Sequence, residues 1–246
     1  MSLARRSLLA FAGLGFLPVA RLARAAATTV KGSGVATTQR REVGAFVGVA
    51  LGAPFAVVLR PAGREAIEIV ADDNLLPLIE TKLRGFGNDR TLQIDLARDT
   101  RVEPRTPVVV TIDYVRLEAL GVGGSGRISA KSMKAPKLDA AIGGSGSIDL
   151  ADLDAGNLAV AIGGSGAFRA DGRARKMSVS IAGSGRCDAE RLVAGDVAVS
   201  VAGSGDTRVR AETALRASIA GSGDVYHRGA ATPQVSIAGG GRVRRI

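Results

Sequence analysis

The sequence predicts an all-β protein, a β-solenoid or β-helix in which coils of about 20 residues stack on one another. GSG occurs six times between residues 121 and 241 and then returns as GGG, with central residues 18 to 20 positions apart. Around each glycine corner, apolar residues alternate with small or polar ones. A fixed step of this size is typical of stacked repeats, and strict alternation is typical of strands with one buried face.

Apolar columns appear when the units are aligned on their central residue. The column three residues before it is β-branched throughout, and the column five residues before it is apolar. The column seven residues before it is apolar from Leu138 to Leu215. The nearest column contains Val122, Ile142, Ile162, Ile181, Val201, Ile219 and Ile237. The column three residues after the centre contains Ile128, Ile148, Phe168, Cys187, Thr207, Val225 and Val243. Each unit therefore predicts a strand, a glycine corner, a second strand and a connecting turn.

Stacking explains why such a unit repeats. A unit of this size cannot bury its own apolar face, whereas a neighbouring copy pairs its backbone groups and continues the core. Glycine suits the corners because it adopts positive φ freely and has no side chain to obstruct the adjacent coil. A sandwich or barrel of hairpins also gives short strands at regular spacing, but it does not require the same side chain at the same place in every unit.

The first 25 residues have the pattern of an export signal. Arg5 and Arg6 precede an apolar run over residues 8–20, and residues 23–25 offer a small-x-small cleavage site. A membrane anchor is the alternative, but the run is shorter than the ~20 residues needed to span a bilayer. The paired arginines leave both the twin-arginine and the general secretory route open. We expect an exported protein of the periplasm or cell surface.

The rest of the chain is expected to form a lead-in and one domain. Residues 26–40 are small and polar and predict a flexible lead-in, and residues 41–246 predict a single solenoid domain whose repeats begin near residue 117. Residues 74–82 predict a short helix capped by Asp73 or Asn74. Before the repeats we expect an atypical capping layer that begins the same sheet. Its strand-like runs are residues 45–51, 55–60, 66–71, 91–96 and 108–114.

The charge balance does not indicate nucleic-acid binding. The formal net charge is +10, and cleavage after Ala25 would lower it to +6 by removing four arginines. The basic residues are scattered, aromatic residues are only 3% of the chain, and no nucleic-acid motif accompanies them. We expect a soluble exterior and no membrane span after signal cleavage. The expected partners are a cell-envelope or surface polymer or protein, and a second copy of the chain.

Three stretches of the sequence together resemble a known family, the putative auto-transporter adhesin head GIN domain proteins. The first is ADDNLLPLI at residues 71–79, the second is the returning IGGSG and IAGSGD units, and the third is GSGDVYHRGAATPQVSIAGGGR at residues 221–242. The resemblance covers about residues 41–244. It implies an exported, all-β, solenoid-like domain, often in bacteria, and it bears on fold and location more than on activity.

The motifs of the sequence predict no catalytic, cofactor-binding or metal site. Gly121, Gly123 and Gly126 spell GxGxxG, but no helix is predicted after them. Calcium-binding glycine repeats need an aspartate at every turn, whereas only Asp206 and Asp224 follow a GSG directly. The repeat serines are expected to satisfy backbone groups with their hydroxyls.

The lone histidine and the lone cysteine are also expected to be noncatalytic. His227 is expected at a surface turn; as a base it could serve only a local serine such as Ser222. Cys187 shares an apolar column, so it is expected to pack in the core, and it has no partner for an internal disulfide.

We therefore predict a noncatalytic, exported cell-envelope protein with an adhesion, binding or scaffolding role. The alternative is a carbohydrate-active β-helix enzyme that acts on an acidic polysaccharide. Its candidate residues are Asp149, Asp152, Asp154 and Asp171 with Arg169 and Arg173. A further hypothesis concerns the small residues four positions before each centre, which would let a second sheet or subunit approach closely. They are Gly121, Ala141, Ala161, Ser180, Ser200, Ser218 and Ser236.

Overall fold

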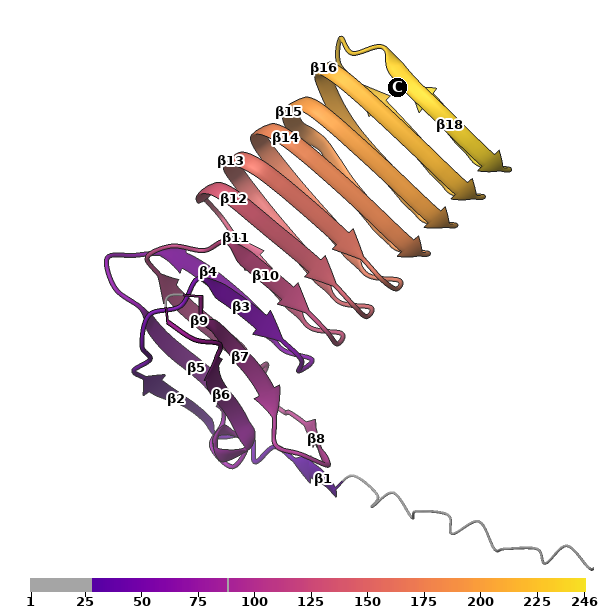
Figure 1. The fold of residues 1–246 in the computed structure, drawn as a ribbon. Helices are drawn as coiled ribbons and strands as arrows, with labels where there is room; N and C mark the ends of the chain where they lie inside the picture. The colour runs from indigo at the N-terminus through magenta and orange to yellow at the C-terminus, as the bar shows by residue number, and fades with distance from the viewer. Residues whose placement is uncertain (1–27, 88) are drawn as a thin grey trace, which may run out of the picture.

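The computed structural model describes residues 28–87 and 89–246, which form a flattened coil that rises from an irregular N-terminal end (Figure 1). Seventeen of the described strands belong to one continuous sheet, and two more form a separate small sheet. The predicted all-β solenoid is confirmed, because successive units pair in parallel and not as antiparallel hairpins.

The regular part of the coil begins at residue 119. Its neighbouring strands keep the register that the sequence columns predict, so that Val160 lies beside Val179 and Ile162 beside Ile181. Its strands are β10 (Ala119–Val122), β11 (Arg127–Ala130), β12 (Met133–Ile142), β13 (Ser147–Ile162), β14 (Ala167–Gly183), β15 (Arg186–Gly203), β16 (Asp206–Gly221), β17 (Asp224–Arg228), β18 (Pro233–Gly239) and β19 (Arg242–Arg245).

Each coil has two sides. The strand that enters a GSG corner belongs to one side, which we call the first sheet, and the strand that leaves the corner belongs to the other, which we call the second sheet. In β13 to β16 a single long strand runs along the second sheet, bends, and returns along the first. The register shifts between these strands all lie in or beside the bend, near Asp152, Gly172 and Glu190.

The core lies between the two sheets. Ile142, Ile162 and Ile181 of the first sheet are at most 2% exposed, and Phe168 and Cys187 of the second sheet are completely buried. Ile237 of β18 occupies the same column but is 42% exposed, because β18 has a first-sheet neighbour, β16, on one side only. The apolar columns therefore face inward, as the alternation predicts.

The corners require glycine because the coils are closely stacked. A Cβ on Gly166 would lie 2.4 Å from Ile142 Cγ2 and 2.7 Å from the Gly146 oxygen of the preceding coil. Gly203 has in addition a φ of +130°, which L side chains rarely adopt. The backbone N–H of Ser145 donates to the oxygen of Gly124, and that of Ser165 to the oxygen of Gly144.

The N-terminal layer continues both sheets, and it contains one coil whose sequence does not follow the repeat. β3 pairs with β10 and β4 with β11, in parallel, and residues 52–55 take the place of a GSG corner. β7 and β9 extend the two sheets in parallel, and the antiparallel strands β6, β5 and β2 follow them. The bounds are β1 (Thr28–Lys31), β2 (Ala36–Arg41), β3 (Gly48–Leu51), β4 (Ala56–Pro61), β5 (Ala66–Asp72), β6 (Ile79–Arg84), β7 (Thr91–Leu96), β8 (Thr100–Glu103) and β9 (Val109–Tyr114).

Two local expectations were wrong. The helix predicted over residues 74–82 is only a 3-10 turn, η1 (Leu76–Leu78), and its N-cap Leu75 makes no side-chain capping bond. β6 follows at once, because pairing with β7 fixes residues 79–84 as a strand. Residues 28–40 contribute strands and not a flexible lead-in, since β1 pairs with β8 and β2 with β5. The predicted export signal lies outside the described residues.

Candidate binding surfaces

The outer side of the second sheet carries a column of alternating charge. Asp149 of β13 lies beside Arg169 of β14, Asp188 of β15 follows, and Arg208 of β16 comes next. The Asp149 carboxylate lies 3.4 Å from Arg169 and 3.6 Å from Arg127, so it has a basic neighbour on each side. The column ends where the Arg208 guanidinium lies over the ring of Tyr226, 5.3 Å from its centroid. Such cross-strand pairs stabilise a sheet by small amounts.

A groove of about 680 Å³ runs across this column, and we call it the charged groove. Its charged side chains come from four successive coils. They are Lys131, Asp149, Arg169, Asp171, Asp188, Glu190 and Arg191. Among the described residues, Lys131 and Arg191 take part in no ion pair. The groove therefore offers two cationic groups that the described part of the chain does not neutralise.

The six charged candidates from the sequence divide into two groups. Asp149, Asp171 and Arg169 line the charged groove, whereas Asp152, Asp154 and Arg173 do not. Arg173 makes two hydrogen bonds to Asp154, and these bonds hold the pKa of the Asp154 carboxyl below its ordinary value. Asp171 accepts a hydrogen bond from the backbone N–H of Asp152 at 2.7 Å. Sequence reasoning missed Asp188, Glu190 and Arg191, although their outward positions in the alternation could have revealed them.

His227 differs from its prediction. It is only 4% exposed, not at the surface, because it follows Val225 by two residues on β17 and points inward with it. Burial, with a smaller contribution from Arg245, lowers the pKa of its imidazole. Its Nδ1 has no hydrogen-bond partner within the described chain. Cys187 is buried as predicted, and burial raises the pKa of its thiol.

The conspicuous ADDN sequence at residues 71–74 has a structural role. The completely buried Asp72 carboxylate accepts hydrogen bonds from the backbone N–H groups of Gly34, Arg105 and Thr106. The Ser33 hydroxyl donates a hydrogen bond to the Asp73 carboxylate, and the Ser33 backbone N–H donates one to the side-chain oxygen of Asn74. A Cβ on Gly32 would lie 1.8 Å from an Asp72 oxygen. The motif therefore fastens the isolated GSG at residues 32–34 to the N-terminal layer.

Other chemistry that the sequence suggested lacks the required arrangement. A strand, β11, follows the GxGxxG spelling at residues 121–126. Asp206 lies 4.0 Å from Arg186, and Asp224 accepts a hydrogen bond from Tyr226. Within the described residues no cluster of His, Cys, Asp and Glu could hold a metal ion. The six repeat serines are exposed, and their hydroxyls make no hydrogen bond to the backbone of the described residues.

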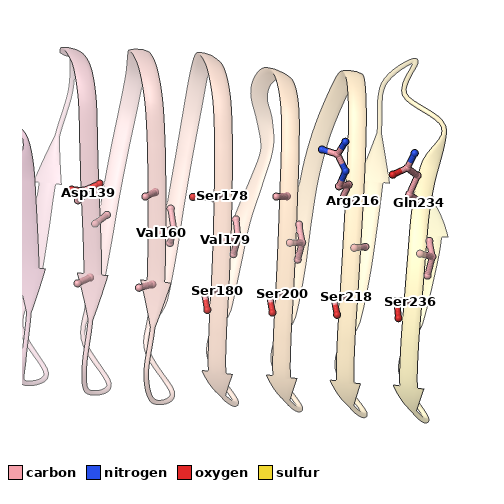
Figure 2. Close-up of a pocket in the computed structure, with 18 residues that line it drawn as sticks. Asp139, Val160, Ser178, Val179, Ser180, Ser200, Arg216, Ser218, Gln234 and Ser236 are labelled. Carbon is pink, nitrogen blue, oxygen red and sulfur yellow. The ribbon is translucent and has the colours of Figure 1, made fainter.

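The outer side of the first sheet forms a second surface, shown in Figure 2. It is hollowed into a groove of about 820 Å³ that crosses β12 to β18. Alanine and serine provide nearly all of its outward side chains, and Ser180, Ser200, Ser218 and Ser236 form one row in the figure. Asp139 of β12 and Arg216 of β16 are its only charged residues. We call this surface the small-residue face.

The parallel coils, glycine corners and continuous apolar core together define a β-solenoid protein. The chain belongs to the family described as "Putative auto-transporter adhesin, head GIN domain", whose profile matches residues 45–231. No curated protein matches the chain. No helix within the described part is long and apolar enough to cross a membrane.

Solved structures of similar fold include proteins from Bacteroides and Parabacteroides species. A putative adhesin from Bacteroides fragilis superposes with a TM-score of 0.82 at 24% identity, covering 88% of this chain and 100% of its own. A putative lipid binding protein from Parabacteroides distasonis gives 0.74 at 22% identity, covering 89% and 100%. A putative adhesin from Parabacteroides merdae gives 0.68 at 21% identity, covering 89% and 99%. At these identities the likeness establishes a shared fold.

Proposed function

We propose that this protein is an exported, noncatalytic component of the cell envelope that acts in adhesion or scaffolding. The adhesin family and the export pattern of residues 1–25 support this role. The observation that carries it is the charged groove, in which Lys131 and Arg191 form no ion pair with any described residue. An extended, rigid surface of stacked repeats suits the binding of a long partner.

The chemistry of the groove favours a polar envelope polymer that offers anionic and hydroxyl groups. Lys131 and Arg191 would contact the anionic groups, while Asp171 and Glu190 would accept hydrogen bonds from hydroxyls. Glu190 is already oriented by an ion pair with Arg228, at 2.9 Å. The partner would lie across several coils, because the lining residues come from β11 to β15.

Cell fractionation and an envelope pull-down test the proposal. We expect the protein in the periplasm or at the cell surface, and we expect it to retain an envelope polymer. The double substitution Lys131→Ala with Arg191→Ala should weaken that retention at least about tenfold, since each lost charge contact is worth ~1 kcal/mol. Arg175→Ala is the matched control, because Arg175 is exposed but lies outside the groove. A cytoplasmic location, or retention of no envelope component, would contradict the role.

A carbohydrate-active enzyme is the second candidate function, because the groove brings Asp149, Asp171 and Arg169 to one surface. Ion pairs with Arg127 and Arg169 hold the Asp149 carboxylate, so the adhesive role is favoured. Incubation with acidic polysaccharides, followed by measurement of chain length, separates the two functions. Depolymerisation that is lost in Asp149→Asn and Asp171→Asn would establish the enzyme.

A further inference from the structure

The small-residue face is a wide, open hollow whose outward side chains are mostly short. Its two central rows consist of alanine, serine and glycine except at Asp139, Arg216 and Gln234. A third row beside the corners is equally small, with Gly143 and Gly163 followed by Ala182, Ala202 and Ala220. Short side chains in all three rows would let a second sheet approach this one closely.

The two charges on this face are placed symmetrically. They occupy the same column, six residues before their corners, and the register connects Asp139 through Ala159, Ser178 and Ala198 to Arg216. Ser178 on β14 is the midpoint of this series. A two-fold axis that runs along β14 within an interface would therefore place Asp139 of one copy opposite Arg216 of the other, twice.

We propose that the small-residue face binds a second copy of this chain in a two-fold symmetric dimer. Isologous dimers are the commonest oligomers and need a self-complementary surface. The axis along β14 places β12 opposite β16, β13 opposite β15, and β10 opposite β18. Alanine and serine then meet alanine and serine across the interface, and the first sheets pack in the aligned manner of β-sandwiches.

The area of the face agrees with a stable dimer. Seven strands at about 4.8 Å spacing, each contributing six residues of about 3.3 Å, cover about 670 Å² per copy. Two copies would bury about 1,300 Å², within the ~1,200–2,000 Å² of specific interfaces. Lys176, at the margin of β14, meets its own copy only at the exposed rim, where water and salt screen the repulsion.

The dimer leaves both charged grooves free. They lie on the second sheets, which face away from the interface on opposite sides of the assembly. The dimer would therefore be bivalent, and binding of two sites on one polymer strengthens retention without any new contact. This consequence rests on the proposed function, but the dimer itself does not.

Light scattering of the purified protein, coupled to size exclusion, tests the dimer. We expect twice the mass of one chain, and we expect one chain's mass for Ser180→Trp, because position 180 meets its own copy at the axis. Ser184→Trp is the matched control: it adds the same bulk at an exposed corner of the same coil and should leave the dimer intact. A wild-type monomer, or a dimer that tolerates Ser180→Trp, would overturn the proposal.

A charge exchange tests the orientation. Arg216→Asp should weaken the dimer by at least about tenfold, since it brings two pairs of like charges together. The double variant Asp139→Arg with Arg216→Asp should restore wild-type association, because it re-forms both pairs with the signs reversed. A double variant that is no better than Arg216→Asp alone would refute the axis along β14. Retention of lipid vesicles on this face, with the protein remaining monomeric, would instead assign the face to lipid.

Discussion

The glycine corners allow a stringent test of how closely the coils stack. Gly163 and Gly166 lie at the two ends of one corner, and neither has a φ in the left-handed region. A Cβ on Gly163 would approach no atom closer than 3.9 Å, whereas a Cβ on Gly166 would lie 2.4 Å from Ile142 Cγ2. The same substitution to alanine is therefore expected to have opposite effects at the two positions.

The magnitudes follow from the contacts. Gly166→Ala forces apart a buried, β-branched side chain and a backbone carbonyl, and such overpacking costs about 1–3 kcal/mol. Gly163→Ala meets no obstruction and restricts the unfolded chain, which stabilises by about 0.4–1 kcal/mol. The two variants should therefore differ by about 1.4–4 kcal/mol in free energy of unfolding. For a domain of this size that gap corresponds to a Tm difference of about 3–16 °C.

Urea and thermal unfolding, followed by circular dichroism, measure the difference. Midpoints should be compared at one protein concentration, because self-association would raise the apparent stability of every variant. Equal midpoints for Gly163→Ala and Gly166→Ala would refute the reasoning, since they would show that the corners accommodate a Cβ without a loss of stability. A lower midpoint for Gly163→Ala than for Gly166→Ala would refute it as well.

Three further predictions concern buried groups. Burial opposes ionisation of Asp72, but hydrogen bonds from Thr106, Arg105 and Gly34 outweigh it and lower the pKa of its carboxyl. The stability that Asp72 provides should thus be present above its unfolded pKa of about 3.9 and disappear as the pH falls further. Asp72→Asn should be less stable than the wild type at pH 7 and should lose less stability on acidification. Urea midpoints of the two proteins that fall in parallel with pH would contradict this prediction. Because the pKa of the His227 imidazole is also lowered, the stability that this side chain provides should decline as the pH falls below about 6.5. The free energy of unfolding of the wild type minus that of His227→Gln should therefore shrink between pH 7.5 and 5.5, and a constant difference would contradict this prediction. Since burial raises the pKa of the Cys187 thiol, an aromatic disulfide reagent should label it only after unfolding, and rapid labelling of the native protein would show that the core is open there.

The sequence predicts the regular coils well because each coil repeats the same apolar columns and the same glycine corner. Ile142, Ile162 and Ile181 repeat at the same offset from a glycine corner, and stacking places them in contact. The coil of β3 and β4 was not recognised as a coil, because Gly52 to Phe55 replace GSG with a different corner. Residues 79–82 were wrongly assigned to a helix, because pairing with β7 is what selects a strand there.

The candidate surfaces were predicted less completely. The small side chains of the small-residue face could be predicted from the alignment. The hollow that they line and the symmetric placement of its two charges depend on the curvature of the sheet and on the register of its strands. Asp188 and Glu190 alternate outward on β15, so their exposure follows from the pattern, whereas their grouping with Lys131 of an earlier coil needs the coil geometry. His227 was misplaced because a polar residue near a turn is usually exposed, and here the inward position overrides that preference.

The register shifts between β13 and β16 show that the two edges of the solenoid differ in their tolerance to length. At the corner edge every unit aligns, while at the bend edge units of 18 to 20 residues are reconciled by local irregularities. Loops, epitopes or labels inserted near Asp152 or Glu190 should therefore leave the stack intact, whereas a single residue added within a GSG would displace every coil beyond it. The bend edge is therefore suited to carry inserted segments, whereas the corner edge fixes the register of the coils.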